Sequence, residues 1–135
     1  MKGYVSTFAG RGSSEGFENG QGTTAKFYFP EGITYNQGIL YVSDSGNNVI
    51  RTVFMNGLVS TFAGTTVAGS DNGNRFSVVI NCRLSATFNY PTQLLFDSNG
   101  NLIICDHYSS LIRMINPLGA VSTITGSAGS GFVDG

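Results

Sequence analysis

Charged side chains are scarce in this sequence of 135 residues. Asp, Glu, Lys and Arg make up 11% of it, against roughly 25% in an average soluble domain, and the formal net charge is −1. No run of basic residues occurs, so the sequence lacks the clustered positive charge by which proteins bind nucleic acid. Three arginines in predicted loops, Arg11, Arg75 and Arg83, are too scattered to change that expectation.

Long apolar runs are also missing. The longest, such as Leu102–Cys105, are far shorter than a membrane-spanning helix, so we expect no membrane insertion. The first ten residues lack the apolar core of a signal peptide, which leaves either a cytosolic protein or a piece of a longer secreted chain. A surface rich in Ser, Thr, Asn and Gly and poor in charge favours the extracellular alternative.

Cysteine and histidine are rare. Cys82 and Cys105 are compatible with one disulfide or with two buried thiols, so cysteine content leaves the compartment open. The only histidine, His107, cannot supply the several ligands of a hydrolytic zinc site or complete a catalytic triad. We therefore predict no catalytic residue, no metal site and no cofactor.

Repetition is what the sequence has in abundance. The hexapeptide VSTFAG occurs at 5–10 and again at 59–64, and VSTITG occurs at 121–126. Segments 38–64 and 101–126 match over their whole length, and three glycine-rich segments, GFENG, GSDNG and GFVDG, recur in the same order. A period of this length indicates a repeat architecture.

The repeat divides the chain into four parts. They are an orphan outer strand in 1–10, a first unit over 11–64, a second unit over 65–126 and a linker over 127–135 that would lead to a missing unit. The extra residues of the second unit fall within 74–87, and insertions of this kind lie at the rim of a repeat protein, where partners bind.

Each unit favours strands, because runs rich in Val, Ile, Phe, Tyr and Thr alternate with Gly, Asn and Asp. The second apolar run of each unit is expected to be buried on both faces, which implies sheet stacked on sheet. Four-stranded antiparallel units stacked in this way favour an all-β fold, the β-propeller. The predicted strands span 31–35, 39–43, 49–55 and 58–63, then 92–96, 101–105, 111–115 and 120–125.

The unit resembles the NHL repeat, a family of propeller blades. The similarity lies in Phe29–Gly32, Gly38–Asp44, Asn47–Arg51 and Gly57–Gly64. The second unit departs from the pattern, since Thr92 stands after its proline in place of glycine, and Ser109 and Ser110 replace the paired asparagines. The resemblance implies a partial NHL propeller of two blades plus an extra outer strand, in a fold that closes with about six blades.

Asp44 and Asp106 recur at one position of the unit and are followed at equal spacing by Arg51 and Arg113. We interpret the aspartates as caps of the turn after the second strand, where a carboxylate accepts backbone N–H bonds, and as ion-pair partners of the arginines. Cys105 stands where the first unit has Ser43 and is expected to fill the core.

Two blades would leave open end faces, because a repeat array needs neighbours or caps. The chain is therefore expected to be part of a longer protein, to close a ring from three copies, or to stack into a filament. The orphan strand over 3–8 would pair with the open edge of another chain. The candidate interface residues are Tyr4, Val5, Thr7, Arg75, Cys82, Arg83 and Phe132.

These observations predict a non-enzymatic scaffold for protein interaction or self-assembly. Its expected partners are other copies of itself, further NHL blades, or a protein bound at the rim loops. The resemblance leaves two alternatives open. One is a fragment of a metal-dependent propeller enzyme, a lyase or hydrolase similar to the peptidylglycine lyases, with its site in other blades. The other is an RNA-binding propeller, which the charge balance disfavours.

Overall fold

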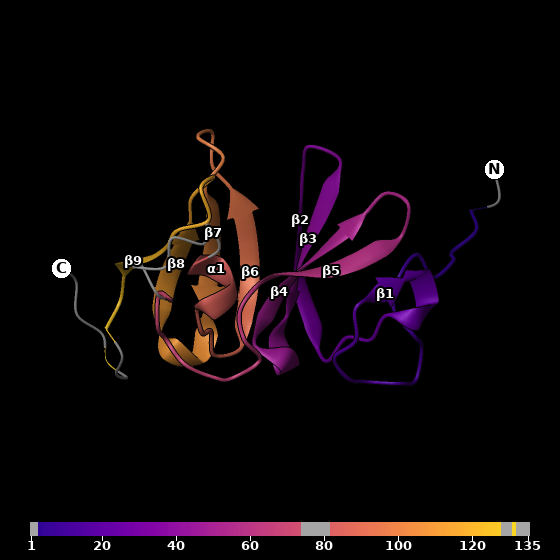
Figure 1. Cartoon of the computed structure of the whole chain (residues 1–135), viewed down its shortest axis with the longest axis horizontal. Helices are drawn as coiled ribbons and strands as arrows, with labels where there is room; N and C mark the ends of the chain where they lie inside the picture. The colour runs from indigo at the N-terminus through magenta and orange to yellow at the C-terminus, as the bar shows by residue number, and fades with distance from the viewer. Residues whose placement is uncertain (1–2, 74–81, 128–130, 132–135) are drawn as a thin grey trace.

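Two antiparallel sheets make up the protein in a computed structural model that describes residues 3–73, 82–127 and 131 (Figure 1). The order of strands is β1-β5-β4-β3-β2 in the first sheet and β6-β7-β8-β9 in the second. The first contains β1 (Gly20–Gln21), β2 (Pro30–Asn36), β3 (Ile39–Asp44), β4 (Val49–Phe54) and β5 (Leu58–Ala63). The second contains β6 (Pro91–Phe96), β7 (Leu102–Asp106), β8 (Leu111–Ile115) and β9 (Val121–Thr125).

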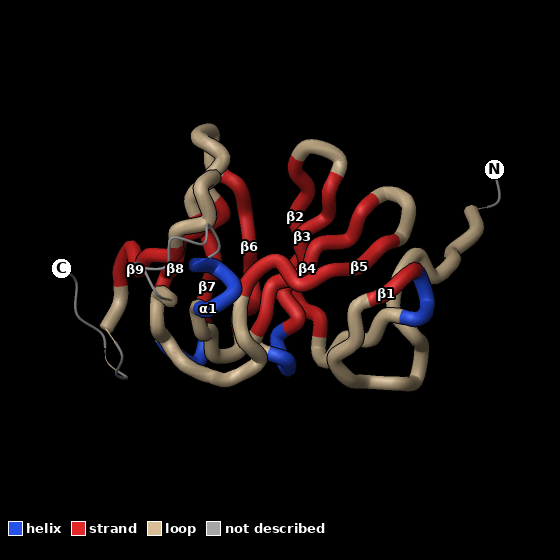
Figure 2. Tube along the Cα trace, in the orientation of Figure 1, coloured by secondary structure: helices blue, strands red, loops and turns tan. Residues whose placement is uncertain are grey.

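The all-β architecture predicted from the sequence is confirmed, because every strand expected in the two units forms to within one residue of its predicted ends. Strands β2 to β5 and β6 to β9 each form a meander in which neighbours in sequence are neighbours in space, as in a propeller blade, and β1 is added beside β5. The sheets lie side by side like two blades, with β2 of the first near β6 of the second (Figure 2). We call them the first and second blade.

Short helices join the strands. Two of them, η2 (Ser45–Asn47) and η3 (His107–Ser109), follow β3 and β7. The other two are η1 (Gly22–Thr24), between β1 and β2, and α1 (Cys82–Ser85), between β5 and β6. Asn48 ends η2 with φ 58° and Ser110 ends η3 with φ 57°, both in the left-handed region. Asn tolerates this conformation well, which explains Asn48.

The outer strand predicted over 3–8 has no strand partner among the described residues, so its pairing with another chain remains a prediction. These residues form no strand, and the side chains of Tyr4 and Val5 are 93% and 102% exposed. A strand needs a partner for its backbone N–H and C=O groups, and no described residue pairs with this segment. Only the end of the hexapeptide is held, where the Gly10 N–H donates to the Gly22 carbonyl at 3.1 Å.

A short strand that the sequence did not reveal covers the outer edge of the first blade. In β1, Gly20 pairs with Val59 and Gln21 with Leu58 of β5. Two residues of this kind have no hydrophobic alternation, so no local pattern indicated a strand. The pairing occupies backbone groups of β5 that would otherwise form an open edge.

The larger hydrophobic core fills the seam between the blades. Its buried members come from both: Ile50, Ala63, Ala86, Phe88, Leu94, Leu102, Ile104, Ile115 and Val121. The Tyr41 ring lies edge-on between Phe62 and Phe96, with ring centroids 5.0 and 4.8 Å away. The blades are therefore joined by burial of apolar surface, the main stabilising contribution in such contacts.

A glycine allows the closest approach of the two blades. Any Cβ at Gly32 would collide with the carbonyl oxygen of Thr92. Ser43 bridges the same point, since its Oγ accepts the Gly32 N–H at 2.7 Å and donates to the Thr92 carbonyl. Strand register corrects the sequence alignment here: Pro30 and Pro91 hold equivalent places, so Gln93 and not Thr92 replaces the glycine.

Among the described residues, no helix is long and apolar enough to cross a membrane.

Candidate functional site

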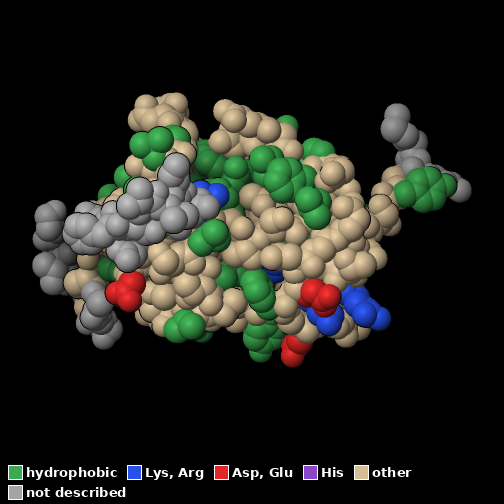
Figure 3. Space-filling view, viewed as in Figure 1, with side chains coloured by type: hydrophobic (Ala, Val, Ile, Leu, Met, Phe, Trp, Pro, Cys, Tyr) green, Lys and Arg blue, Asp and Glu red, His purple; other side chains and the backbone are tan. Residues whose placement is uncertain are grey.

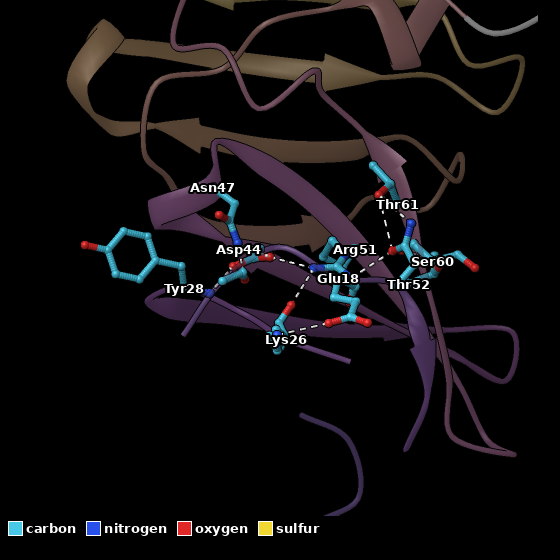
Figure 4. A network of polar contacts seen from close by, with 11 residues as sticks. Glu18, Lys26, Tyr28, Asp44, Asn47, Arg51, Thr52, Ser60 and Thr61 are labelled. Atoms are coloured by element: carbon cyan, nitrogen blue, oxygen red, sulfur yellow. Dashed lines mark hydrogen bonds and ion pairs between the residues drawn. The ribbon is translucent and has the colours of Figure 1, made fainter. Parts of the chain in front are cut away.

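A buried arginine connects the first blade to the segment that precedes it (Figure 4). The Arg51 side chain is 0% exposed, and its Nη1 donates to Asp44 Oδ2 at 2.7 Å and to the Lys26 carbonyl at 3.0 Å. Its Nη2 donates to the Glu18 carbonyl and to Asn19 Oδ1, both at 2.8 Å. One side chain thus binds two separate parts of the leading segment to β4.

The second blade repeats this arrangement. Arg113, also 0% exposed, donates to Asp106 Oδ2 at 3.0 Å and to the Thr87 carbonyl at 3.2 Å. Its other terminal nitrogen donates to the Asp71 carbonyl at 3.1 Å and to Asn72 Oδ1 at 2.7 Å. Recurrence of the same bonds in both blades assigns the Asp–Arg pairs to the architecture of the blade, because a ligand site would not need to be duplicated.

The aspartates do not cap the helical turns, and that interpretation is wrong. Neither Asp44 nor Asp106 makes a side-chain cap bond to η2 or η3. Instead, Asp44 Oδ1 accepts the backbone N–H of Tyr28, and Asp106 Oδ1 accepts that of Asn89, each at 2.7 Å. The two donors lie just before β2 and β6, 16 and 17 residues away from the aspartates they bind. No rule for local turns could therefore identify them.

Burial raises the pKa of Asp44 above its ordinary value, and the N–H groups of Tyr28, Asn47 and Arg51 oppose that rise. Its partner Arg51 has aromatic neighbours. Arg51 lies between the rings of Phe17 and Phe27, with its guanidinium carbon 4.9 Å from each centroid. These stacking contacts add cation–π attraction to the ion pair.

The first blade has an apolar face that points away from the second. Val42, Val53 and Val59 form a small buried cluster there with Ala25. The cluster borders an apolar groove of about 310 Å³, which is lined by Thr7, Phe8, Ala9, Phe27, Pro30, Ile33, Leu40, Val42 and Val53. Ile33 is 62% exposed, so the N-terminal segment covers this face only in part. We call it the first open face.

The second blade also has an apolar face on the side away from the seam. Strand alternation places the residues that point toward the first blade at Leu94, Leu102, Ile104 and Ile115, and all four are buried. The alternate positions form the second open face: Leu95, Ile103, Cys105, Ile112 and Met114. Ile124 is assigned to the same face because it lies in the β9 bulge, where its counterpart in the first blade, Phe62, packs into the seam. Leu95 is 56% and Ile124 52% exposed, so no described residue fully covers this face.

Sequence reasoning expected open end faces but did not name the residues that form either of them. It expected sheets stacked on sheets, but it had no means to tell which strand faces are covered by the other blade. The signal that was available is the continuous apolar run in the second strand of each unit, Leu40–Val42 and Leu102–Cys105. Both faces of such a strand are apolar, and here only one of them lies in the seam.

The predicted interface residues are dispersed. Tyr4, Val5 and Thr7 are exposed in the N-terminal segment, while Arg75 and Phe132 lie outside the described residues. The other two, Cys82 and Arg83, lie in α1, and no disulfide links Cys82 to Cys105. Thr7 is next to the first open face, at the edge of its groove. The roles proposed for these residues remain predictions.

His107 lies in an exposed aromatic cluster. Its ring centroid is 4.9 Å from Tyr108 and 6.3 Å from Tyr90. The Tyr90 hydroxyl donates to Glu31 Oε1 of the first blade at 2.7 Å, and this bond raises the pKa of Tyr90 to about 12. Within the described part of the chain, no three His, Cys, Asp or Glu side chains come together as a metal site would require.

Comparisons with known proteins agree with the two-blade geometry. The family model described as NHL repeat matches residues 27–51, from the segment before β2 to Arg51. NHL repeat-containing protein 2 of Bos taurus is 32% identical over 101 residues, which cover 73% of this chain and 13% of that protein. Protein SUPPRESSOR OF QUENCHING 1, chloroplastic, of Arabidopsis thaliana is 40% identical over 65 residues, 46% of this chain and 6% of that protein.

Among solved structures, a protein of unknown function from Bacteroides thetaiotaomicron superimposes with a TM-score of 0.70 and 29% identity, over 85% of this chain and 27% of that one. The present chain thus spans a small part of each of these relatives. The family match, the repeated Asp–Arg pairs and the two stacked meanders agree with one another. The chain belongs to the NHL-repeat family, and its two sheets are blades of an NHL-type β-propeller.

Proposed function

We propose that this chain is a non-enzymatic scaffold that associates with further NHL blades through its two open faces. The observation that carries the proposal is the seam itself. One blade of this chain already buries an apolar face of its neighbour, and each blade has a second apolar face that no described residue fully covers. Exposed apolar patches of this kind mark interaction surfaces.

The two open faces belong to different sides of a blade, so a contact between them is heterologous. Such a contact forms a closed ring when its rotation closes and a filament when it does not. The chain covers only 13% of its bovine relative, so the additional blades can come from the same polypeptide or from other copies. Either source would cover the same apolar side chains.

The seam between the blades indicates what an added blade must satisfy. Gly32 and Ser43 allow the second blade to come close to the first, but Gln93 and Cys105 hold the corresponding places on the second open face. A blade added there cannot repeat the Gly–Ser contact. We expect it to pack against the larger apolar side chains of that face, of which Met114 is one.

Native mass by light scattering tests the proposal. The chain of 14.3 kDa is expected to form multimers, and Ile33→Asp on the first open face or Ile124→Asp on the second should shift it to monomers. A charge placed in a buried apolar contact costs several kcal/mol unless it is paired, enough to dissociate most assemblies.

Leu118→Asp is the matched control, because Leu118 is 80% exposed in the turn between β8 and β9 and lies on neither face. It should leave the mass unchanged. A wild-type chain that is monomeric and unfolds cooperatively would contradict the proposal, as would multimers that persist in both open-face variants. Mixing the chain with a polypeptide of additional NHL blades distinguishes the two sources of the added blades. If blades of another sequence are the preferred partner, heteromers should replace the homomultimers.

A further inference from the structure

A pocket of about 420 Å³ lies between the blades on the side opposite η2 and η3. Its walls are the turn from β2 to β3, the turn from β6 to β7, and the turn from β8 to β9. Phe62, Phe96 and Tyr41 form its aromatic part. Figure 3 shows hydrophobic side chains between the turn regions that project at the top of the view, with a basic side chain beside them.

Arg83 of α1 supplies the cation of this pocket. Its place in the repeat is that of Gly22 in the first unit, because Gly10 and Gly64 end equivalent hexapeptides and donate to the Gly22 and Arg83 carbonyls. The first blade forms with no side chain at this position. Unlike Arg51 and Arg113, Arg83 is therefore not part of what a blade needs in order to fold.

The guanidinium of Arg83 is fixed in orientation but retains donors. Its Nε donates to the Phe62 carbonyl at 2.8 Å, and its carbon lies 4.8 Å from the centroid of the Phe62 ring. The two terminal nitrogens have no hydrogen bond to any described residue, and one of them lies beside Gly119. A guanidinium held in this way presents its fork of N–H groups toward a planar anion.

Other donors face the same space. The Tyr41 hydroxyl makes no hydrogen bond within the described part of the chain, and the Asn99 and Asn116 amides also line the pocket. No carboxylate is among the lining residues. Asp97, at the start of the β6–β7 turn, already accepts the backbone N–H groups of Asn99 and Asn101, at 2.9 and 2.8 Å, so its charge is engaged within the turn.

We propose that this seam pocket binds a small organic carboxylate with an aromatic or other apolar body. The carboxylate would accept hydrogen bonds from Arg83 and Tyr41, and the body would lie among Tyr41, Phe62 and Phe96. The pocket volume falls within the range of about 300–1,000 Å³ typical of small-molecule sites, which combine apolar walls with a few placed polar groups. The pocket lies within one chain, so the proposal does not depend on association through the open faces.

Benzoate titrated into the ¹⁵N-labelled chain tests the site, with the amide signals of Gly100 and Gly119 as reporters. We expect saturable shifts of both signals. Benzamide has the same shape without the charge, and it should bind at least about tenfold more weakly because it loses charge-assisted hydrogen bonds. Arg83→Gln should reduce benzoate affinity to that of benzamide, whereas Arg11→Gln, an exposed arginine elsewhere in the chain, should not change it.

Three results would overturn the proposal. They are the absence of saturable shifts, equal affinity for benzoate and benzamide, and unchanged benzoate binding by the Arg83→Gln variant. Inorganic phosphate that binds as tightly as benzoate would contradict the role given to the aromatic walls. The comparison of benzoate with benzamide uses the unaltered chain, so it decides the matter even if the substitution at Arg83 perturbs folding.

Discussion

Replacing Arg113 by methionine tests how much the buried arginine and its ion pair contribute to the stability of a blade. Both side chains of the Arg113–Asp106 pair are 0% exposed. Methionine keeps an apolar stem beside Phe88, which the guanidinium now covers with its carbon 5.3 Å from the ring centroid. The substitution leaves the carboxylate buried without its cation, and it also removes the donors to the Asp71 carbonyl and Asn72 Oδ1.

The expected cost is large because breaking a buried pair from one side destabilises proteins by about 3–5 kcal/mol. Urea unfolding followed by circular dichroism measures it. With a slope of about 1–3 kcal/mol per molar urea for a small protein, the midpoint should fall by at least about 1 M. Because Asp106→Asn removes the uncompensated charge, the double variant should lose less than the sum of the two single losses, with a coupling of about 1–3 kcal/mol.

The exposed pair between Lys26 and Glu18 provides the control. Its charged atoms are 3.1 Å apart, but the two side chains are 30% and 53% exposed. Glu18→Gln should therefore cost less than about 1 kcal/mol, since water screens such a pair and the side chains lose entropy to hold it. A loss below about 1 kcal/mol for Arg113→Met, or additive losses in the double variant, would refute the role given to the buried pair.

Other predictions follow from single contacts. Gly32→Ala should destabilise the seam by about 1–3 kcal/mol in urea unfolding, because its Cβ would meet a carbonyl oxygen of the second blade. Gln93→Ala, at the equivalent place of the second blade, should change stability by no more than about 0.5 kcal/mol. Ultraviolet titration should show Tyr90 ionising at a pKa of about 12, and Glu31→Ala should lower that pKa toward 10.0 by removing both the acceptor of its hydrogen bond and the nearby negative charge. Hydrogen bonds from the Asn101 side chain and backbone lower the pKa of Asp97 below 3.8, so its stabilisation is present above that pH and is lost as the pH falls through the folded-state pKa. Asp97→Asn should remove this part of the acid dependence, as urea unfolding at a series of acidic pH values would show; an unchanged dependence would contradict it.

The sequence by itself determined the four strands of each predicted unit, the repeat and the ion-pair partners. Strand alternation and turn residues are local signals, so 49–55 and 111–115 could be recognised as strands without any knowledge of their neighbours. Asp and Arg at equal spacing in two units indicated an interaction within each blade, and the register of adjacent strands brings them together: Asp44 pairs with Val49, two residues before Arg51.

Only the tertiary structure decided which backbone groups and which surfaces these elements use. Residues 3–8 have the sequence of a strand but form none, since pairing is a property of two segments. Asp44 binds the N–H of Tyr28 and not the adjacent turn, because the pairing of β2 with β3 places Pro30 opposite Asp44 and Arg51 holds the preceding segment in place. The pocket around Arg83 likewise joins residues from turns far apart in the sequence. Local composition carries no information about these contacts between distant segments, because they depend on how strands pair and on how one blade stacks on the next.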